Sequence, residues 1–120
     1  MKEAERITAH LCMTKDIGVE GNLFGGVMLS WMDEAAALFA HQYTRMARVV
    51  TLKYAELLFK RPVRVGDLVE FYVRNPKLGR SSLTFDIEAL VGEHIVLQTS
   101  TTFVAVDEAG HPTAIDRTAR

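Results

Sequence analysis

The chain has 120 residues, of which 48% are hydrophobic and 24% charged, and its formal net charge is −1. These values are typical of one folded domain, residues 1–120, and they exclude a disordered chain and a general attraction to nucleic acid or anionic membranes. Cys12 is the only cysteine, which excludes an intramolecular disulfide, and no apolar run has the length of a signal peptide or membrane span, so we expect a cytoplasmic protein without membrane insertion.

The sequence pattern predicts a strand, one long helix and then four more strands. Residues 7–14 alternate between apolar and polar side chains, as a strand with one buried face does, and residues 25–43 have apolar residues at helical spacing over a length too great for a strand. The four later strands are predicted at residues 49–59, 68–74, 82–91 and 95–107. Short connections favour antiparallel neighbours, so we expect an α+β fold in which one sheet wraps around one helix.

The long helix carries an acid, Asp33, away from its polar face. On a helical wheel the polar face comprises Ser30, Glu34 and His41. Asp33 lies roughly 60° from the nearer edge of this face, which predicts that its side chain points toward an apolar wall or a tight contact. A buried carboxylate needs a partner, and desolvation tunes carboxyl groups toward general-base chemistry. Asp33 is therefore either a structural acid, bonded to backbone or to Arg45 or Arg48, or a catalytic base.

Gly25 and Gly26 begin the predicted helix and also allow two interpretations. Glycines at a helix start leave amide groups free at the positive end of the helix dipole, where an oxyanion or phosphate can bind. Glycines also occur where a helix crosses a sheet so closely that a side chain would clash. The pair alone does not separate the two interpretations.

Four segments in a fixed order resemble the YciA-like and brain-type acyl-CoA hydrolase family of the hotdog superfamily. They are "GNLFGGVMLSWMDEAAA", "VVTLKYAELLFKRPVRVGD", "GRSS" and "TFVAVDEAGHP". The resemblance extends over about residues 16–112. It implies a hotdog fold, in which a five-stranded antiparallel sheet wraps around one long central helix. It also implies homodimers whose sheets join, assembled further into hexamers as trimers of dimers.

The resemblance further implies hydrolysis of an acyl-CoA thioester to a carboxylic acid and free coenzyme A. Asp33 would activate water as a general base or attack the acyl carbon as a nucleophile, and the Gly25 and Gly26 amides would bind the oxyanion. Coenzyme A is then part of the substrate, and neither a separate cofactor nor a metal is expected. Because Gly25 and Asp33 are separated by about 12 Å along one helix, each site must combine the glycine turn of one subunit with Asp33 of another.

The chain departs from the family pattern just before the helix. The family's "D-x-N" motif keeps its aspartate as Asp16, but Gly18 stands where the asparagine is usual. Asn22 is the nearest asparagine and is a candidate to supply an amide to the site. Its alternative role is helix capping or turn formation.

Binding of coenzyme A phosphates requires local positive charge despite the neutral total. Basic residues cluster in "FKRPVRVGD", and Lys77 and Arg80 occur in the "KLGRSS" loop. Either cluster alone could be a solvated loop, but the resemblance places nucleotide contacts near such loops. The candidate substrate-binding residues are Thr51, Arg61, Gly79, Arg80, Ser81 and Ser82. The alternative function is that of an acyl-CoA-binding protein without catalysis, a sensor or carrier. A third possibility, a hydratase, would need a histidine near the acid, and His41 lies two turns from Asp33.

Overall fold

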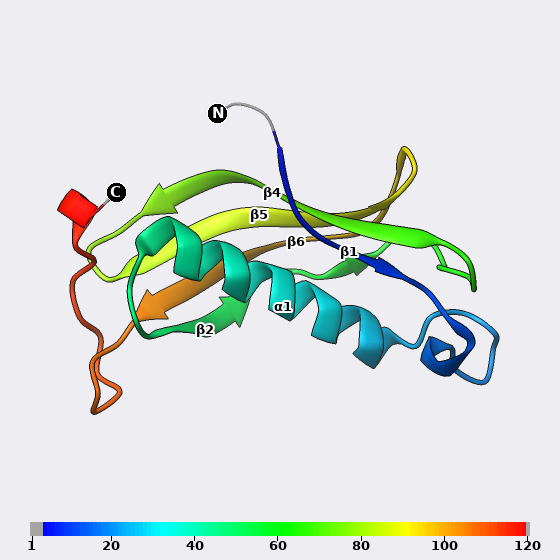
Figure 1. Cartoon of the computed structure of the whole chain (residues 1–120), viewed down its shortest axis with the longest axis horizontal. Helices are drawn as coiled ribbons and strands as arrows, with labels where there is room; N and C mark the ends of the chain where they lie inside the picture. Colours follow the sequence, from blue (N-terminus) through cyan, green and yellow to red (C-terminus); the bar gives the residue numbers. More distant parts are fainter. Residues whose placement is uncertain (1–3, 120) are drawn as a thin grey trace.

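A computed structural model describes residues 4–119 as one antiparallel sheet that curves around one long helix (Figure 1). The elements are β1 (Glu5–Leu11), η1 (Thr14–Asp16), α1 (Gly25–Thr44), β2 (Val49–Tyr54), β3 (Leu58–Phe59), β4 (Leu68–Leu78), β5 (Ser82–Val91), β6 (His94–Ala105) and η2 (Arg117–Ala119). The sheet order is β1-β4-β5-β6-β2, and the short β3 also pairs with β6. The predicted α+β fold and its five main strands are confirmed, with the predicted strand at residues 49–59 divided into β2 and β3.

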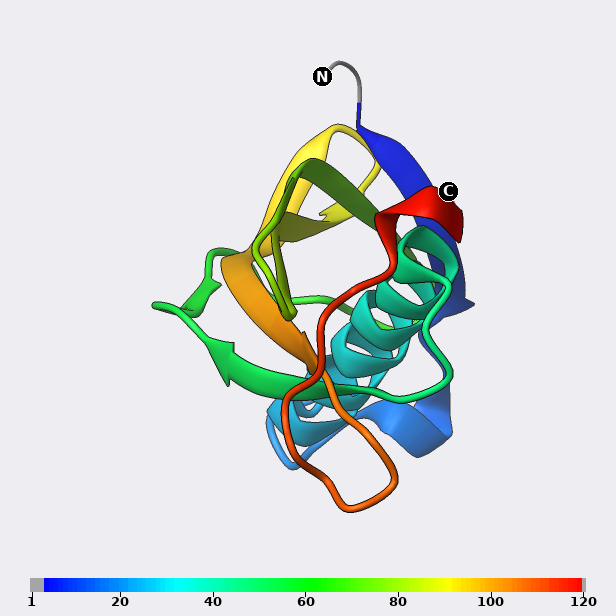
Figure 2. The ribbon, with the colours of Figure 1, turned by 90° about the vertical axis from the view of Figure 1, so that its left-hand side faces the viewer.

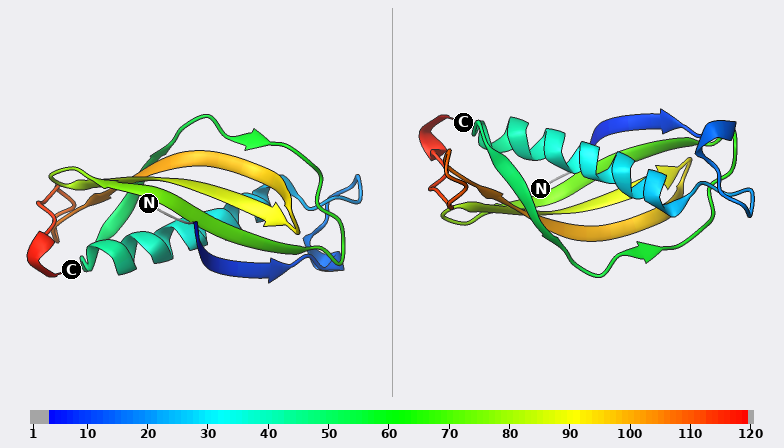
Figure 3. Two further views of the ribbon diagram at one scale, coloured as in Figure 1. Left: turned by 90° about the horizontal axis from the view of Figure 1, so that it is seen from above. Right: turned by 90° about the horizontal axis from the view of Figure 1, so that it is seen from below.

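The sheet has a free edge on either side of the helix. Figure 2 shows it curving around α1 from β1 on one side to β2 on the other, and the two views in Figure 3 show α1 on a single face of the sheet. Both edge strands therefore lie next to the helix. No helix within residues 4–119 has the length and apolar character needed to cross a membrane.

The first strand is shorter than predicted, and it buries the side chains that were expected on its polar face. A register shift between Arg6 and Thr8 moves the pairing of β1 with β4 by one residue, and such a shift reverses which side chains face inward. Cys12 is consequently buried, whereas Leu11 and Met13 are 51% and 49% exposed. The predicted alternation is present from Thr8 to Met13, but after the bulge the face of Ala9, Leu11 and Met13 is the exposed one.

The predicted strand at residues 49–59 is divided into β2 and β3. Its pairing with β6 shifts by one residue between Thr51 and Lys53, and by one more between Tyr54, which faces Thr101, and Leu58, which faces Gln98. Each shift adds a residue that the partner strand does not match, so the ladder breaks between the two strands. Strand β4 instead extends to Leu78, with its own register shift after Arg74.

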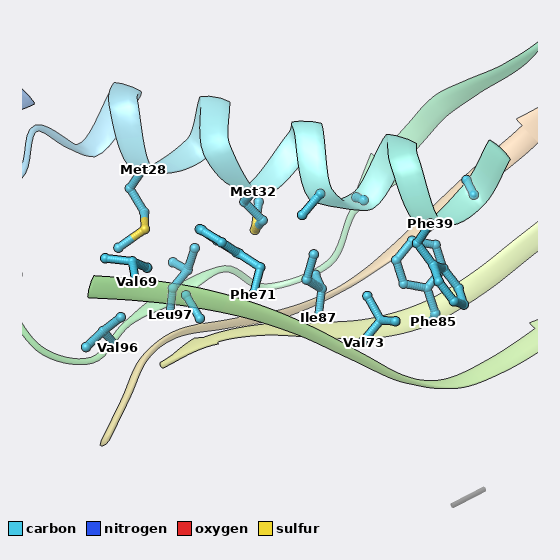
Figure 4. Packing of buried hydrophobic residues seen from close by; sticks show 14 of the residues in the cluster. Met28, Met32, Phe39, Val69, Phe71, Val73, Phe85, Ile87, Val96 and Leu97 are labelled. Carbon is cyan, nitrogen blue, oxygen red and sulfur yellow. The ribbon is translucent and has the colours of Figure 1, made fainter. Parts of the chain in front are cut away.

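One face of α1 packs against the inner face of the sheet, as Figure 4 shows. The helix contributes Met28, Met32, Ala35, Ala36, Phe39 and Ala40, and the sheet contributes Val69, Phe71, Val73, Phe85 and Ile87, all buried. Each large side chain buried in this way contributes about 1.5–3 kcal/mol to folding. The small alanine side chains let the helix lie close to the sheet. This packing determines which side chains of α1 face the edge strands.

Candidate active site

Asp33 lies in the middle of α1 and faces β2. Thr51 donates a hydrogen bond from Oγ1 to Oδ1 of Asp33 over 3.2 Å, and Tyr54 donates one from its phenol to the same oxygen over 2.5 Å. The contact predicted for Asp33 exists, but its partners are not the backbone, Arg45 or Arg48. The Asp33 side chain is also exposed in the single chain rather than set against an apolar wall, because β2 is an edge strand.

Tyr54 is the functional candidate that the sequence did not predict. Residues three apart in a regular strand point to opposite faces, so Thr51 and Tyr54 would not be expected to share a partner. The register shift between Thr51 and Lys53 brings both side chains to the helix side. Burial raises the pKa of the Tyr54 phenol, and the neighbouring Asp33 carboxylate raises it further, so the phenol remains a protonated donor.

The glycine turn forms the free amino-terminal end of α1. Phe24 is the N-cap residue and makes no side-chain capping bond, while its carbonyl oxygen accepts hydrogen bonds from the amides of Val27 and Met28. The amides of Gly25 and Gly26 meet no acceptor within residues 4–119. This is the arrangement of donors that an oxyanion site requires.

A hollow of about 320 Å³ opens beside this helix end. It is lined by Asn22, Leu23, Gly25, Met28, Phe59, Lys60, Arg61, Pro62 and Val63. The predicted catalytic residues Asn22 and Gly25 and the predicted substrate-binding residue Arg61 are thus brought together. Asp33 does not line the hollow, as expected from its separation of about 12 Å from Gly25 along the helix.

Asn22 does not cap the helix, because the N-cap position is occupied by Phe24. Its backbone carbonyl oxygen accepts a hydrogen bond from the Gly18 amide over 2.9 Å, which closes the turn before α1. The capping interpretation was therefore wrong, whereas the role of the Asn22 side chain in the turn or in the site stays a prediction. A Cβ atom at Gly18 would lie 3.3 Å from the Phe24 ring, so the turn packs closely at the position where the family has asparagine.

The loop of residues 79–82 lies at the opposite end of the molecule from the start of α1 (Figure 1). The Gly79 amide donates to the Ser82 carbonyl over 2.8 Å, and the Arg117 guanidinium donates to the carbonyl oxygens of Leu78 and Gly79. These bonds hold the loop in one shape. The predicted substrate-binding residues at 79–82 are therefore ordered, but one chain does not bring them next to Arg61.

A larger hollow of about 790 Å³ lies between the carboxyl-terminal half of α1 and the strands β1, β4 and β5. Phe39, Tyr43 and Phe85 are among its lining residues. None of the residues that carry the proposed chemistry borders it, so its size does not make it the active site. Within residues 4–119, no group of three or more histidine, cysteine or acidic side chains is placed to hold a metal ion.

Comparisons with known proteins identify the family of the chain. Residues 20–98 match the Thioesterase superfamily. The acyl-CoA thioester hydrolase YciA of Salmonella typhimurium is 35% identical over 119 residues, which cover 92% of this chain and 89% of that protein. The crystal structure of the hexameric thioesterase y2039 from Yersinia pestis superposes with a TM-score of 0.87 at 35% identity and covers 97% of this chain and 98% of that one.

A second solved structure carries a substitution of one of its aspartates. It is an aspartate-to-alanine mutant of HI0827, a hexameric broad-specificity acyl-coenzyme A thioesterase, with a TM-score of 0.87 and 31% identity over 96% of this chain and 88% of that one. The chain therefore belongs to the thioesterase superfamily, as a hotdog-fold member of the YciA-like family of acyl-CoA thioester hydrolases.

Proposed function

We propose that this protein hydrolyses acyl-CoA thioesters and that Asp33 is its catalytic carboxylate. The observation that carries the proposal is the hydrogen bonding of Asp33, whose two donors both bind Oδ1. The Oδ2 atom accepts no hydrogen bond within residues 4–119 and is free to act on water or substrate. Membership in the YciA-like family supports a thioester as the substrate.

In the general-base route, the oxygen of a water molecule attacks the acyl carbonyl carbon while Asp33 takes a proton from that water. The Gly25 and Gly26 amides stabilise the negative charge on the carbonyl oxygen. The carbon–sulfur bond then breaks, and the sulfur leaves with the proton as free coenzyme A. In the alternative route, Asp33 attacks the carbonyl carbon itself, the carbon–sulfur bond breaks, and the sulfur leaves as the coenzyme A thiolate, which takes up a proton. Water then hydrolyses the resulting anhydride to the carboxylic acid and restores the Asp33 carboxylate.

Each site needs two subunits, because the free amides and Asp33 are too far apart along one helix to meet a single carbonyl group. Strand β2 offers the contact. It ends the sheet, and its side chains Val50 and Leu52 are 49% and 61% exposed, so its open edge and apolar surface favour pairing with a second copy. We propose a two-fold dimer in which the two β2 strands pair antiparallel.

This dimer would also complete the coenzyme A site. A two-fold axis at β2 reverses the partner, so the partner's loop of residues 79–82 comes to the end at which Gly25 and Arg61 lie. Arg80, Ser81 and Ser82 of one subunit and Arg61 of the other would then bind one nucleotide, with charge-assisted hydrogen bonds to its phosphates. Arg61 and Arg80 are both exposed in the single chain and free to do so.

A second apolar surface favours assembly beyond the dimer. Leu11, Met13, Val65 and Leu68 are each at least 46% exposed at the β1 edge, which lies away from β2. The two solved relatives described above are hexameric. We propose that this edge joins three dimers into a hexamer.

Replacement of Asp33 tests the proposed function. We expect Asp33→Ala to lower kcat/KM by at least about a hundredfold without changing the oligomer, because a general base contributes this much to the rate. Release of free thiol from short-, medium- and long-chain and aromatic acyl-CoAs measures turnover. Near wild-type rates in the variant would exclude this mechanism, and binding without turnover by the wild-type protein would identify an acyl-CoA sensor or carrier instead.

A further inference from the structure

We propose that Tyr54 is a positioning residue for catalysis, which orients the Asp33 carboxylate through a hydrogen bond to Oδ1. The inference rests on the proposed function of Asp33 and adds a second residue to it. It assigns the orientation of the carboxylate to a side chain of β2 rather than to the helix that carries Asp33.

The first argument is the distribution of donors. Tyr54 and Thr51 both donate to Oδ1 of Asp33, at 2.5 Å and 3.2 Å. Two donors on one oxygen fix the rotation of the carboxylate about its terminal bond, because any turn of the group breaks one of the bonds. The other oxygen then has one preferred direction, and reaction geometry depends on such alignment.

The second argument is that Tyr54 is the stronger and steadier of the two donors. Hydrogen bonds to an ionised carboxylate are shorter and stronger than neutral ones, and the phenol makes the shorter bond. Desolvation and the nearby carboxylate raise the pKa of the phenol, so Tyr54 keeps its proton and donates throughout the neutral range. Thr51 is exposed, whereas Tyr54 is only partly exposed and packs against the hydrophobic core.

The third argument is the support behind Tyr54. Its backbone pairs with Thr101 of β6, a strand in the interior of the sheet, and Thr101 donates from Oγ1 to the carbonyl oxygen of Lys53 next to it. The phenol is therefore attached to a rigid element and not to a loop. Functional groups held by side chains on such elements keep their geometry best.

Tyr54 takes no part in the proton transfers themselves. The proton from water moves to Asp33 and then to the leaving sulfur, while the Tyr54 proton stays on its oxygen. Removing the phenol oxygen should therefore reduce kcat and leave substrate binding unchanged. A purely structural role would instead change stability, or change KM together with kcat.

The test is a double-mutant cycle with Tyr54→Phe and Asp33→Ala. We expect Tyr54→Phe to lower kcat by about tenfold with KM within about twofold, because a hydrogen bond to a charged group is lost. In the Asp33→Ala background the same change should have no further effect. Tyr72→Phe is the matched control, since Tyr72 lies between the buried Phe71 and Val73 on the sheet face away from α1. An equal reduction of kcat in both backgrounds, or a rise in KM of more than about twofold, would overturn the proposal.

A second measurement does not depend on turnover. With tyrosine labelled by carbon-13 at Cζ, the Tyr54 signal is the one that disappears in Tyr54→Phe. We expect this signal to move in Asp33→Ala while the Tyr72 signal stays in place, and an unchanged Tyr54 signal would overturn the hydrogen bond. If the signal moves but the wild-type protein turns over no acyl-CoA, the hydrogen bond stands, and the proposed function and the catalytic role of Tyr54 are both wrong.

Discussion

At the scale of single residues, Asp16 stabilises the segment that leads from β1 to the glycine turn. It is the last residue of η1. Its buried carboxylate accepts hydrogen bonds from the Met13 amide over 2.9 Å and the Lys15 ammonium over 2.8 Å. The bond from Lys15, followed by that from the Met13 amide, lowers the pKa of Asp16 below its ordinary value. Its carbonyl oxygen accepts from the Phe24 amide just before α1, so this acid connects β1 to the glycine turn.

A lowered pKa in the folded state means that ionised Asp16 stabilises the fold. This stabilisation is fully present above the ordinary carboxyl pKa of 3.8 and is lost as the pH falls through the lower folded value. We therefore expect Asp16→Asn to reduce the free energy of unfolding at pH 7, with the difference from wild type shrinking below about pH 4. Urea unfolding at a series of pH values measures it, and a difference that stays constant with pH would contradict this role.

The residues of the candidate site were predictable to different degrees from the sequence. Asp33 was predictable because helical geometry alone places it off the polar face, and Thr51 because the family resemblance includes its strand. Tyr54 was not, since its contact with Asp33 depends on a bulge that no alternation of side chains reveals. The exposure of Asp33 also depends on tertiary structure, because only the strand order shows that β2 is an edge.

At the scale of elements, the helix and the later strands followed from periodicity, whereas their interruptions did not. The predicted strand at 82–91 has the observed bounds, and the predicted helix ends one residue before Thr44. The main errors lie at the register shifts in β1, β2 and β4. At a bulge, two residues of one strand face a single residue of its partner. The residue types in either strand do not reveal where this occurs, so the bulge could not be predicted from periodicity.

The amino-terminal end of α1 allows a test of the oxyanion site without disturbing the fold. Proline is well tolerated as the first helical residue, because the amide that it lacks is free there. Gly25 holds that position, and Phe24 before it has φ −66° and ψ 134°, which is the conformation that favours a following proline. A Cβ atom at Gly25 would meet nothing closer than the Phe59 ring at 4.0 Å.

We expect Gly25→Pro to lower kcat by about a hundredfold to a thousandfold, as the loss of one oxyanion donor does, while the thermal unfolding midpoint stays near that of wild type. Gly25→Ala is the matched variant, since it adds a Cβ atom at the same place and retains the amide. Its kcat should remain well above that of Gly25→Pro. Equal losses in the two variants would assign the effect to bulk in the hollow and would contradict the role of the amide.

At the scale of the whole molecule, the proposed roles of Gly25 and Asp33 would make the subunit contact part of the catalytic mechanism, because the two residues are separated by about 12 Å along one helix. Two identical sites would form across each two-fold interface, and each would take its glycine turn from one subunit and its carboxylate from the other. On this proposal, a dimer of chains that all lack the Gly25 amide, or that all lack the Asp33 carboxylate, would have a defect in both of its sites. Combined in one dimer, the two kinds of chain would leave one site with both defects and one site with none.

Co-expression of Gly25→Pro and Asp33→Ala chains in equal amounts therefore distinguishes a shared site from a site within one chain. Random pairing makes half of the dimers mixed, and each mixed dimer has one intact site of two, so we expect about one quarter of the wild-type kcat per subunit. The same two variants, purified separately and assayed as a mixture without subunit exchange, provide the control. If co-expressed chains are no more active than that control, both groups must act within one chain, and the oxyanion donors must be sought nearer to Asp33 than the start of the helix.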